Sequence, residues 1–473
     1  MKRLRHRTGM AGSGRIQGRT HLQNTETRST SPLSRSALLG WYRRNRDRTR
    51  QIFDLVSEEA YFSQPIALRH PIVFYEGHLP AFSFNTVVRK ALGMPSIDRD
   101  LETLFARGID PHETAAAGGD SRSRWPSRAT VHAFADEADR QVIAALENAD
   151  LSQPGHPTLD RAEAVFSILE HEAMHQETLL YMWHRLPLSQ KTKPAGYHAR
   201  TAGPTPPHEW IHVPAGDAIL GADRDSIEFG WDNEIPALVE PTLAFTIERH
   251  DVTNARYLEF VAAGGYRDAR WWTPDDWQWV QSERVEHPLF WERTGNDDWH
   301  WRGMFEHLPL PLSWPVYVSH AEACAFTRWS GARLPTEAEF QRAAFGSPAG
   351  DRPHPWGSEP PSSHRGVFDF TSWDPEPAGT HPSGASAWGV EDLVGNGWEW
   401  TSTVFAPFPG FRAMASYPEY SADFFDGQHI VMKGASPVTA RELLRPTFRN
   451  WFRGRYPYVY ATFRCARDAS PRS

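Results

Sequence analysis

The chain has 473 residues, enough for two or three domains that each bury a core. Its formal charge of −8 and isoelectric point near 6.3 argue against a nucleic-acid-binding protein, whose surface would be basic. Two widely separated cysteines predict no disulfide framework and favour a cytoplasmic protein. No apolar run is long enough to span a membrane, so no membrane partner is expected.

The first part of the chain has the pattern of a basic tail followed by a helical bundle. Residues 1–33 are predicted to be disordered, because the first 40 residues carry eight Lys or Arg, one acid and no apolar segment. In residues 34–185, apolar residues at helical spacing predict four helices. They cover Ser36 to Val56, Pro71 to Leu92, Thr130 to Leu146, and Asp160 to Trp183. The polar stretch from Asp98 to Arg124 is predicted to be a long loop, which makes the arrangement a four-helix bundle with one crossover.

Two histidines four residues apart, His171 and His175, stand in the fourth predicted helix. Residues at this spacing share one helix face, so both imidazoles can bind a single divalent metal ion. The alternative is a pair of hydrogen-bonded core histidines. The string also matches the H-E-x-x-H pattern of zinc hydrolases, in which Glu172 would activate a water. The extension found in metzincins is missing, because Thr178 and Tyr181 stand where Gly and His are required.

A third candidate ligand, His78, lies upstream on the first turns of the second predicted helix. Metal sites are often built in bundle cores from facing helices. Three neutral imidazoles with open positions would suit Fe(II) oxygen chemistry. The spacing alone leaves open whether His78 meets the other two.

The composition changes after a Pro-rich linker at residues 186–208. Seventeen of the twenty Trp follow residue 200, with many Gly and Pro. We expect one clear helix, from Ser319 to Gly331, a second helix beginning at Thr336, and otherwise short strands and ordered loops.

Five motifs in residues 209–470 resemble the formylglycine-generating enzyme (sulfatase-modifying factor) domain, which implies a C-type-lectin-like fold with little regular secondary structure. The motifs are Gly230-Trp231-Asp232-Asn233-Glu234, Thr253-Asn254-Ala255-Arg256-Tyr257, Arg333-Leu334-Pro335-Thr336-Glu337-Ala338-Glu339, Gly395-Asn396-Gly397-Trp398-Glu399-Trp400 and Phe463-Arg464-Cys465-Ala466-Arg467. The expected fold class is therefore multidomain, α followed by α+β. Formylglycine formation itself is not expected, because the stretch that matches the family's copper-binding cysteines, residues 433–451, has no cysteine.

A DinB-like bundle joined to such a domain resembles the ergothioneine sulfoxide synthase and selenoneine synthase family. In that family a His after Gly or Ala and an H-E-x-x-H-x-E segment supply the ligands, which here are His78, His171 and His175. The resemblance implies a non-haem Fe(II) enzyme that uses O2 to join a chalcogen atom to C2 of the hercynine imidazole. Tyr417 matches the family's proton donor and Tyr420 a substrate-contacting Tyr. The alternative for Tyr417 and Tyr420 is a pair of packing side chains.

The resemblance also implies a substrate pocket. Asn450 matches an Asn that holds the trimethylammonium group, and Trp451 would line the same pocket. Where γ-glutamylcysteine-using members carry Asp and Arg, this chain has Phe452 and Tyr456, with Arg453 and Arg455 between them.

Met174 replaces a Gln that precedes the second helix His in those members. These departures argue against γ-glutamylcysteine as the donor, because unpaired polar groups are costly. The resemblance to the selenoneine synthases, whose selenosugar donor has no amino-acid ends to bind, implies a selenosugar instead. The alternatives are a sulfoxide synthase that uses cysteine or γ-glutamylcysteine, a zinc hydrolase that uses His171, Glu172 and His175, and a non-catalytic lectin-like binding module.

Overall fold

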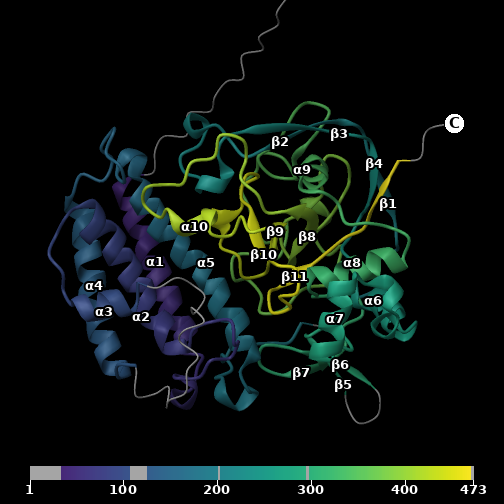
Figure 1. The fold of residues 1–473 in the computed structure, drawn as a ribbon, viewed down its shortest axis with the longest axis horizontal. Helices are drawn as coiled ribbons and strands as arrows, with labels where there is room; N and C mark the ends of the chain where they lie inside the picture. Colours follow the sequence, from purple (N-terminus) through teal and green to yellow (C-terminus); the bar gives the residue numbers. More distant parts are fainter. Residues whose placement is uncertain (1–33, 107–124, 201–202, 294–297, 470–473) are drawn as a thin grey trace, which may run out of the picture. The chain divides into compact units, whose positions relative to one another are not determined.

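The computed structural model describes residues 34–106, 125–200, 203–293 and 298–469, and Figure 1 traces them from purple to yellow. These described residues belong to one compact unit. The predicted basic tail, residues 1–33, lies outside the described residues, as does most of the predicted loop between Asp98 and Arg124.

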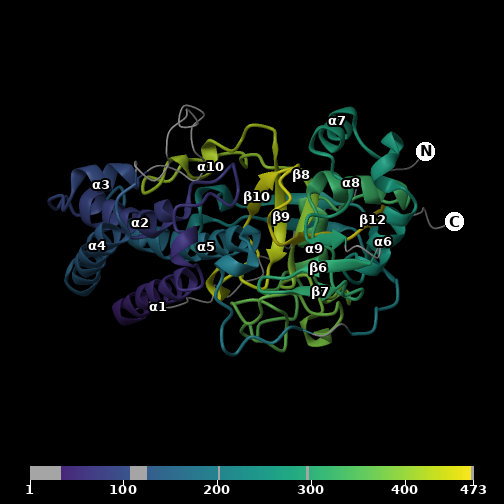
Figure 2. The same ribbon diagram turned by 90° about the horizontal axis from the view of Figure 1, so that it is seen from below.

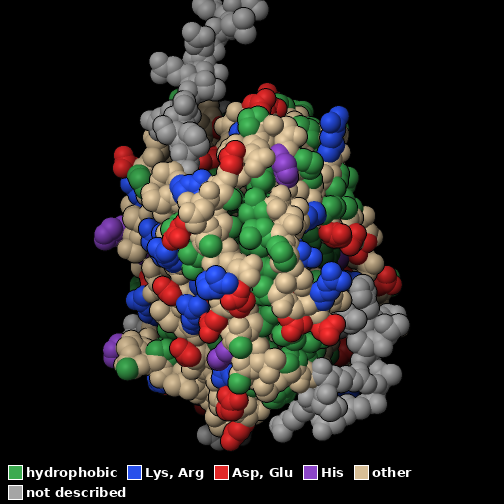
Figure 3. All heavy atoms as spheres, turned by 90° about the vertical axis from the view of Figure 1, so that its left-hand side faces the viewer, with side chains coloured by type: hydrophobic (Ala, Val, Ile, Leu, Met, Phe, Trp, Pro, Cys, Tyr) green, Lys and Arg blue, Asp and Glu red, His purple; other side chains and the backbone are tan. Residues whose placement is uncertain are grey.

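The first part of the described chain is a helical bundle. Its helices are α1 (Arg35–Phe53), α2 (Ile72–Ser83), α3 (Arg99–Leu104), α4 (Arg128–Asn148) and α5 (Glu163–Arg185). The π-helical segment η2 (Phe84–Ala91) follows α2 directly. Figure 3 shows the bundle's outer face, where side chains of both charges are mixed with apolar groups, as expected for helices that bury their other face.

The four long helices occur where the apolar periodicity predicts them, but the prediction of a loop beginning at Asp98 was wrong. Asp98 accepts hydrogen bonds from the backbone N–H groups of Asp100 and Leu101 and so caps α3. A helix of six residues is too short to show helical periodicity in the sequence.

In its described residues, the second part consists of short strands, five α-helices and long ordered connections. The strands are β1 (Trp210–Val213), β2 (Gly216–Leu220), β3 (Leu238–Thr242), β4 (Phe245–Glu248), β5 (Trp291–Arg293), β6 (Trp299–Arg302), β7 (His307–Pro309), β8 (Gly397–Val404), β9 (His429–Ala435), β10 (Asn450–Arg453), β11 (Ala461–Thr462) and β12 (Ala466–Asp468). They form four small sheets in the orders β1-β4-β12, β2-β3, β5-β6-β7 and β10-β9-β8-β11. In the last of these β8 pairs antiparallel with β9 and parallel with β11.

The helices of this part are α6 (Asn254–Ala262), α7 (Pro274–Glu283), α8 (His320–Trp329), α9 (Glu337–Phe345) and α10 (Glu419–Ala422). Helices α8 and α9 were predicted, and both begin with a capping box. The expectation of strands and loops elsewhere was wrong for α6, α7 and the four-residue helix α10. The helices α6 and α7 are short, and each begins after a capping Thr. A single capping residue is a weak helix signal when few apolar residues follow at helical spacing.

Helix α5 connects the two parts of the molecule. Figure 2 shows it between the other bundle helices and the sheet β10-β9-β8-β11. One apolar core includes Leu169 and Trp183 of α5 together with Trp301 and Trp398 of the second part. The predicted fold class, a helical bundle followed by a domain with sparse sheets, is confirmed. In the described ranges, no helix combines the length and apolar character that crossing a bilayer requires.

Candidate metal centre

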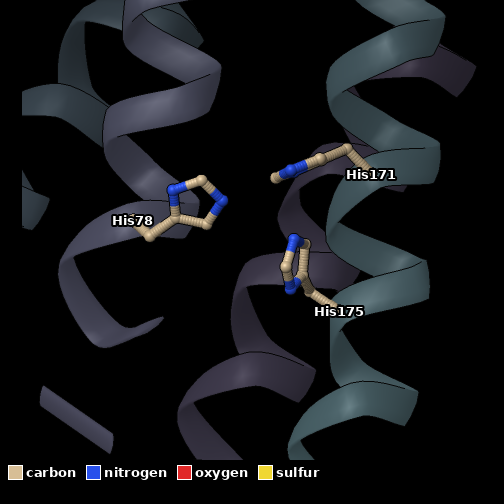
Figure 4. A group of neighbouring side chains, drawn as sticks. All are labelled: His78, His171 and His175. Atoms are coloured by element: carbon tan, nitrogen blue, oxygen red, sulfur yellow. The ribbon is translucent and has the colours of Figure 1, made fainter. Parts of the chain in front are cut away.

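Three histidines from two helices converge in the core of the bundle (Figure 4). His78 lies on α2, and His171 and His175 lie on neighbouring turns of α5. The ring centroids are 5.2 Å apart for His78 and His171, 5.1 Å for His78 and His175, and 4.4 Å for His171 and His175. One nitrogen of each ring lies within 4.8 Å of the other two, and no other group of three such side chains is found in the described residues. The structure thus brings together the three residues that the sequence suggests as ligands.

The three imidazoles are buried and present nitrogens without partners. Each is at most 3% exposed. Nδ1 of His78 donates to the backbone carbonyl of Phe105 at 2.7 Å, which leaves the lone pair on its Nε2. That Nε2, Nε2 of His171 and both ring nitrogens of His175 are buried without a hydrogen-bond partner. A backbone acceptor that fixes one ring nitrogen while the other stays free is the arrangement typical of metal-binding histidines.

Burial also sets the charge of the site. It lowers the pKa of His78 to about 4, partly offset by the Phe105 carbonyl. Burial lowers the pKa values of His171 and His175 well below their ordinary range, and the neighbouring imidazoles lower them further. All three rings are therefore neutral at pH 7, the form that binds metal ions. Because unpartnered polar groups in a core cost several kcal/mol, this donor set fits one divalent ion with three imidazole ligands.

Local packing explains why the first ligand follows a glycine. A Cβ atom on Gly77 would lie 2.4 Å from the Phe105 ring, so only glycine lets that ring lie against α2. Phe105 caps the end of the short helix α3, and its carbonyl orients His78. Aromatic rings support two of the ligands: Phe74 stacks on His78 at 4.9 Å, and Phe82 stacks on His171 at 3.6 Å.

Glu172, the acid of the H-E-x-x-H string, is held by α1. Its Oε1 accepts from Nη1 of Arg46 at 2.9 Å and from Oγ1 of Thr49 at 2.6 Å. Arg46 also pairs with Asp139 of α4. A hydrolase of this pattern needs its carboxylate beside the metal-bound water. The contacts of Glu172 favour a role in fixing α5 against α1 instead.

Two tyrosines from the second part lie against the triad. Tyr417, in the loop before α10, has its ring centroid 6.0 Å from that of His171 and 5.1 Å from that of Phe82. Burial, with smaller contributions from Glu419 and Asp423, raises its pKa to about 12. Tyr420 lies on α10, and its hydroxyl donates to Sδ of Met174 at 3.3 Å. Tyr417 therefore lies beside His171, and Tyr420 contacts Met174 on the same helix. The roles of Met174, Tyr417 and Tyr420 stay predictions.

Strand β10 supplies the next predicted residues. The Trp451 ring lies 5.2 Å from that of Tyr420, and the neighbouring Asn450 accepts from the Trp451 backbone N–H through Oδ1. Phe452 faces Tyr181 of α5 at 6.2 Å and stacks on Tyr456 at 5.3 Å.

The two predicted arginines of this segment are not drawn into the site by any described contact. Arg453 is exposed on β10. Arg455 donates through Nε to Asp276 of α7 at 2.8 Å. A substrate role for these two side chains stays a prediction.

Two residues beside the triad carry no signal in the sequence. Arg69 donates to the Tyr456 hydroxyl at 3.0 Å, its guanidinium lies over the rings of Tyr456 and Phe452, and its charge lowers the pKa of His175. His70 stacks on Phe74 at 4.0 Å and lowers the pKa of His78. Both precede α2 in an irregular segment, where neither periodicity nor spacing marks a site residue.

Comparison with known proteins identifies the family. The DinB superfamily model matches residues 42–179, and the sulfatase-modifying factor enzyme 1-like domain matches residues 198–469. The hercynine oxygenase of Mycolicibacterium smegmatis is 37% identical over 292 residues, 60% of this chain and 67% of that protein. The hercynine oxygenase of Mycobacterium tuberculosis is 36% identical over 351 residues, 72% of this chain and 80% of that protein. The chain belongs to the hercynine oxygenase family.

As a member of the hercynine oxygenase family, the chain is an enzyme. Ergothioneine biosynthesis protein 1 of Neurospora crassa is also similar, 26% identical over 501 residues, 88% of this chain and 56% of that protein. The resemblance that the sequence motifs suggest is thereby confirmed at the level of the family and of its two-domain architecture.

The contact between Gly77 and Phe105 can be tested through metal affinity. We expect Gly77→Ala to displace the Phe105 ring and weaken Fe(II) binding by about 10–100-fold, the usual loss when the group that orients a ligand is disturbed. Anaerobic Fe(II) titration of the wild-type chain and of the Gly77→Ala variant measures the difference in affinity. Gly40→Ala in α1 is the matched control, because its Cβ would meet nothing closer than 3.6 Å and Ala favours the helix. Equal Fe(II) affinity in the two variants would contradict the role of this contact.

Proposed function

We propose that the chain is an O2-dependent non-haem Fe(II) enzyme that forms a carbon–selenium bond between C2 of the hercynine imidazole and a selenosugar. The observation that carries the proposal is the buried triad of neutral imidazoles with unpartnered nitrogens. Membership of the hercynine oxygenase family supports hercynine as the acceptor and O2 as the oxidant.

Iron is the metal we propose for His78, His171 and His175. Three imidazole ligands leave positions open, and bound iron supplies the redox chemistry that couples O2 to bond formation. A zinc hydrolase is disfavoured because Glu172 is held by Arg46 and Thr49. A purely lectin-like binding role is disfavoured because it gives no reason for a ligand set buried in the bundle.

We assign the hercynine end of the pocket to Tyr420, Asn450 and Trp451. Trp451 presents an aromatic face near Tyr420, and such a face attracts a quaternary ammonium group by about 0.5–2 kcal/mol. Stacking on Phe405 at 4.2 Å holds the Trp451 ring in place. Asn450, the residue before Trp451 on β10, would orient the same group through its amide dipole.

We assign the proton donor to Tyr417. Its pKa of about 12 keeps the phenol protonated throughout the neutral range, as a donor requires. Its position against His171 supports delivery of that proton next to the metal.

We assign the donor end of the predicted pocket to a group of aromatic side chains. Tyr181, Phe452 and Tyr456 lie together, with the Arg69 guanidinium over all three rings. No carboxylate stands at position 452 to bind an α-ammonium group, whereas flat rings and a guanidinium suit the C–H faces and hydroxyls of a sugar. The second candidate is a sulfoxide synthase with a thiol donor, which the similarity to an ergothioneine biosynthesis protein favours.

A donor competition tests the proposed reaction. The Fe(II)-loaded enzyme is given hercynine, O2 and equal amounts of a 1-selenosugar, γ-glutamylcysteine and cysteine, and the products are separated by mass. We expect the selenium adduct to dominate, with no product under anaerobic conditions. In Phe452→Asp, a carboxylate is restored opposite Tyr181, so the share of γ-glutamylcysteine adduct should rise. If the wild-type enzyme prefers either thiol, the selenosugar is not the donor and the sulfoxide synthase candidate is supported.

Replacement of Tyr417 by Phe tests the proton donor. We expect the variant to bind Fe(II) and hercynine normally but to lose about 10²–10⁴-fold in coupling rate or to release a diverted product. Rapid-quench product analysis measures this rate. Tyr42→Phe is the control, because its hydroxyl bonds Asp139 within the bundle and the loss should affect stability alone. Unchanged coupling in Tyr417→Phe would remove the assignment.

A further inference from the structure

Three cationic side chains meet at the end of α5, away from the metal centre. Arg185 is the last residue of α5, Arg302 is the last of β6, and Lys191 follows the 3-10 turn after α5. Figure 1 shows this end of α5 beside β6 and β7. Nη2 of Arg302 donates to the backbone carbonyl of Leu186 at 2.9 Å, and His184 donates to the Arg302 carbonyl at 2.5 Å. These bonds hold Arg302 against the residues that flank Arg185.

Each of the three cations has a buried nitrogen that is not satisfied. Nη1 of Arg185, Nζ of Lys191 and Nε of Arg302 are shielded from solvent and have no hydrogen-bond partner within the part of the chain that the structure describes. Charged donors are the groups for which a missing partner is most costly. The charges of Arg302 and Arg185 act on Lys191, and Arg302 bonds the residue after Arg185, so the three unpartnered nitrogens belong to one region of the molecule.

Among the described residues, Glu292 and Asp374 contribute negative charge near the cluster. Burial, then the charges of Arg302 and Arg185, lowers the pKa of Lys191 to about 7. Burial, then the Arg302 charge, lowers the pKa of Arg185 to about 10. Of the two nearby acids, Glu292 already accepts from Arg302 at 3.0 Å and from His307 at 2.8 Å.

The other nearby acid is Asp374. It is held by the Tyr197 hydroxyl at 3.3 Å and by Nε1 of Trp301 at 3.4 Å, and burial raises its pKa to about 6. Neither acid therefore satisfies the free nitrogens.

We infer that Arg185, Lys191 and Arg302 form a binding site for an oxyanion, a phosphate or carboxylate group that accepts from their three free nitrogens. Arginine and lysine donors that converge on one point are the usual partners of such groups. The site is distinct from the triad, because ten residues of helix separate Arg185 from His175, about 15 Å along the axis. The anion is either a free inorganic ion or the acidic end of a larger molecule.

Anion-dependent thermal stability of the full chain tests the site. The midpoint Tm is measured in Tris chloride and after replacement of chloride by phosphate, sulfate or acetate at constant ionic strength. A ligand that binds only the folded chain raises Tm with its concentration. We expect a rise in wild type, and an affinity about tenfold or more weaker in Lys191→Met or Arg185→Met, because a charged donor is lost. A larger response to phosphate and sulfate indicates an inorganic or phosphoester ligand, and an equal response to acetate indicates a carboxylate.

The change in Tm that Lys191→Met causes in chloride alone distinguishes an anion-binding role of Lys191 from a structural role. In chloride alone, Lys191→Met should melt no lower than wild type, because the change removes an uncompensated buried charge. Lys193→Met is the matched control, since Lys193 is 46% exposed and pairs with Glu306, and it should keep the full anion response. A wild-type Tm that is indifferent to the anion would overturn the inference. So would an equal response in Lys191→Met, or a Lys191→Met chain that is destabilised in chloride.

Discussion

Helix α5 is buried on nearly every side, and its acids hold it in place from both parts of the molecule. A buried carboxylate is tolerated only when it is paired or accepts several hydrogen bonds. Glu172 meets that condition inside the bundle. Glu170 and Glu177 meet it through the second part. Their partners there are Arg445 at 2.7 Å for Glu170, and Trp398 at 2.8 Å, Ser436 at 2.7 Å and Thr439 at 2.8 Å for Glu177. Contacts with both parts of the molecule thereby fix the position of α5, and with it the positions of His171 and His175.

The contacts of Glu170 and Glu177 allow the proposed catalytic groups to come from two differently built parts of the chain. The bundle supplies His78, His171 and His175, because regular helices can place imidazoles on facing turns. The irregular part supplies Tyr417 and the β10 residues that we propose for substrate binding, because its ordered loops are not restricted to a regular backbone path. The relative placement of the groups from the two parts therefore depends on the contacts of Glu170 and Glu177.

The sequence predicted those features whose signal is local. The spacing of His171 and His175 on an apolar helix, and the capping boxes before α8 and α9, are visible in short windows. The dispersed motifs and the Gly before His78 led to the right family. The reason for that glycine was not visible, because it is a contact with Phe105 from a helix too short to predict.

What the sequence could not predict depends on contacts between distant residues. The position of Arg69 beside His175, and the partners of Glu172, follow from packing between segments far apart in the chain. The same limit explains Arg453 and Arg455, which the segment around Asn450 suggested but which the described contacts do not bring to the triad.

We propose that three neutral imidazoles, one from α2 and two from α5, bind one iron. X-ray absorption at the iron edge of the anaerobic Fe(II)-loaded protein gives the sharpest test of this assignment. We expect one iron per chain, nitrogen neighbours at about 2.1 Å and the multiple-scattering signature of three imidazoles. The imidazole signature should fall by one ring in His78→Ala. A spectrum with two or fewer imidazoles in the unaltered protein, or one that His78→Ala leaves unchanged, would contradict it.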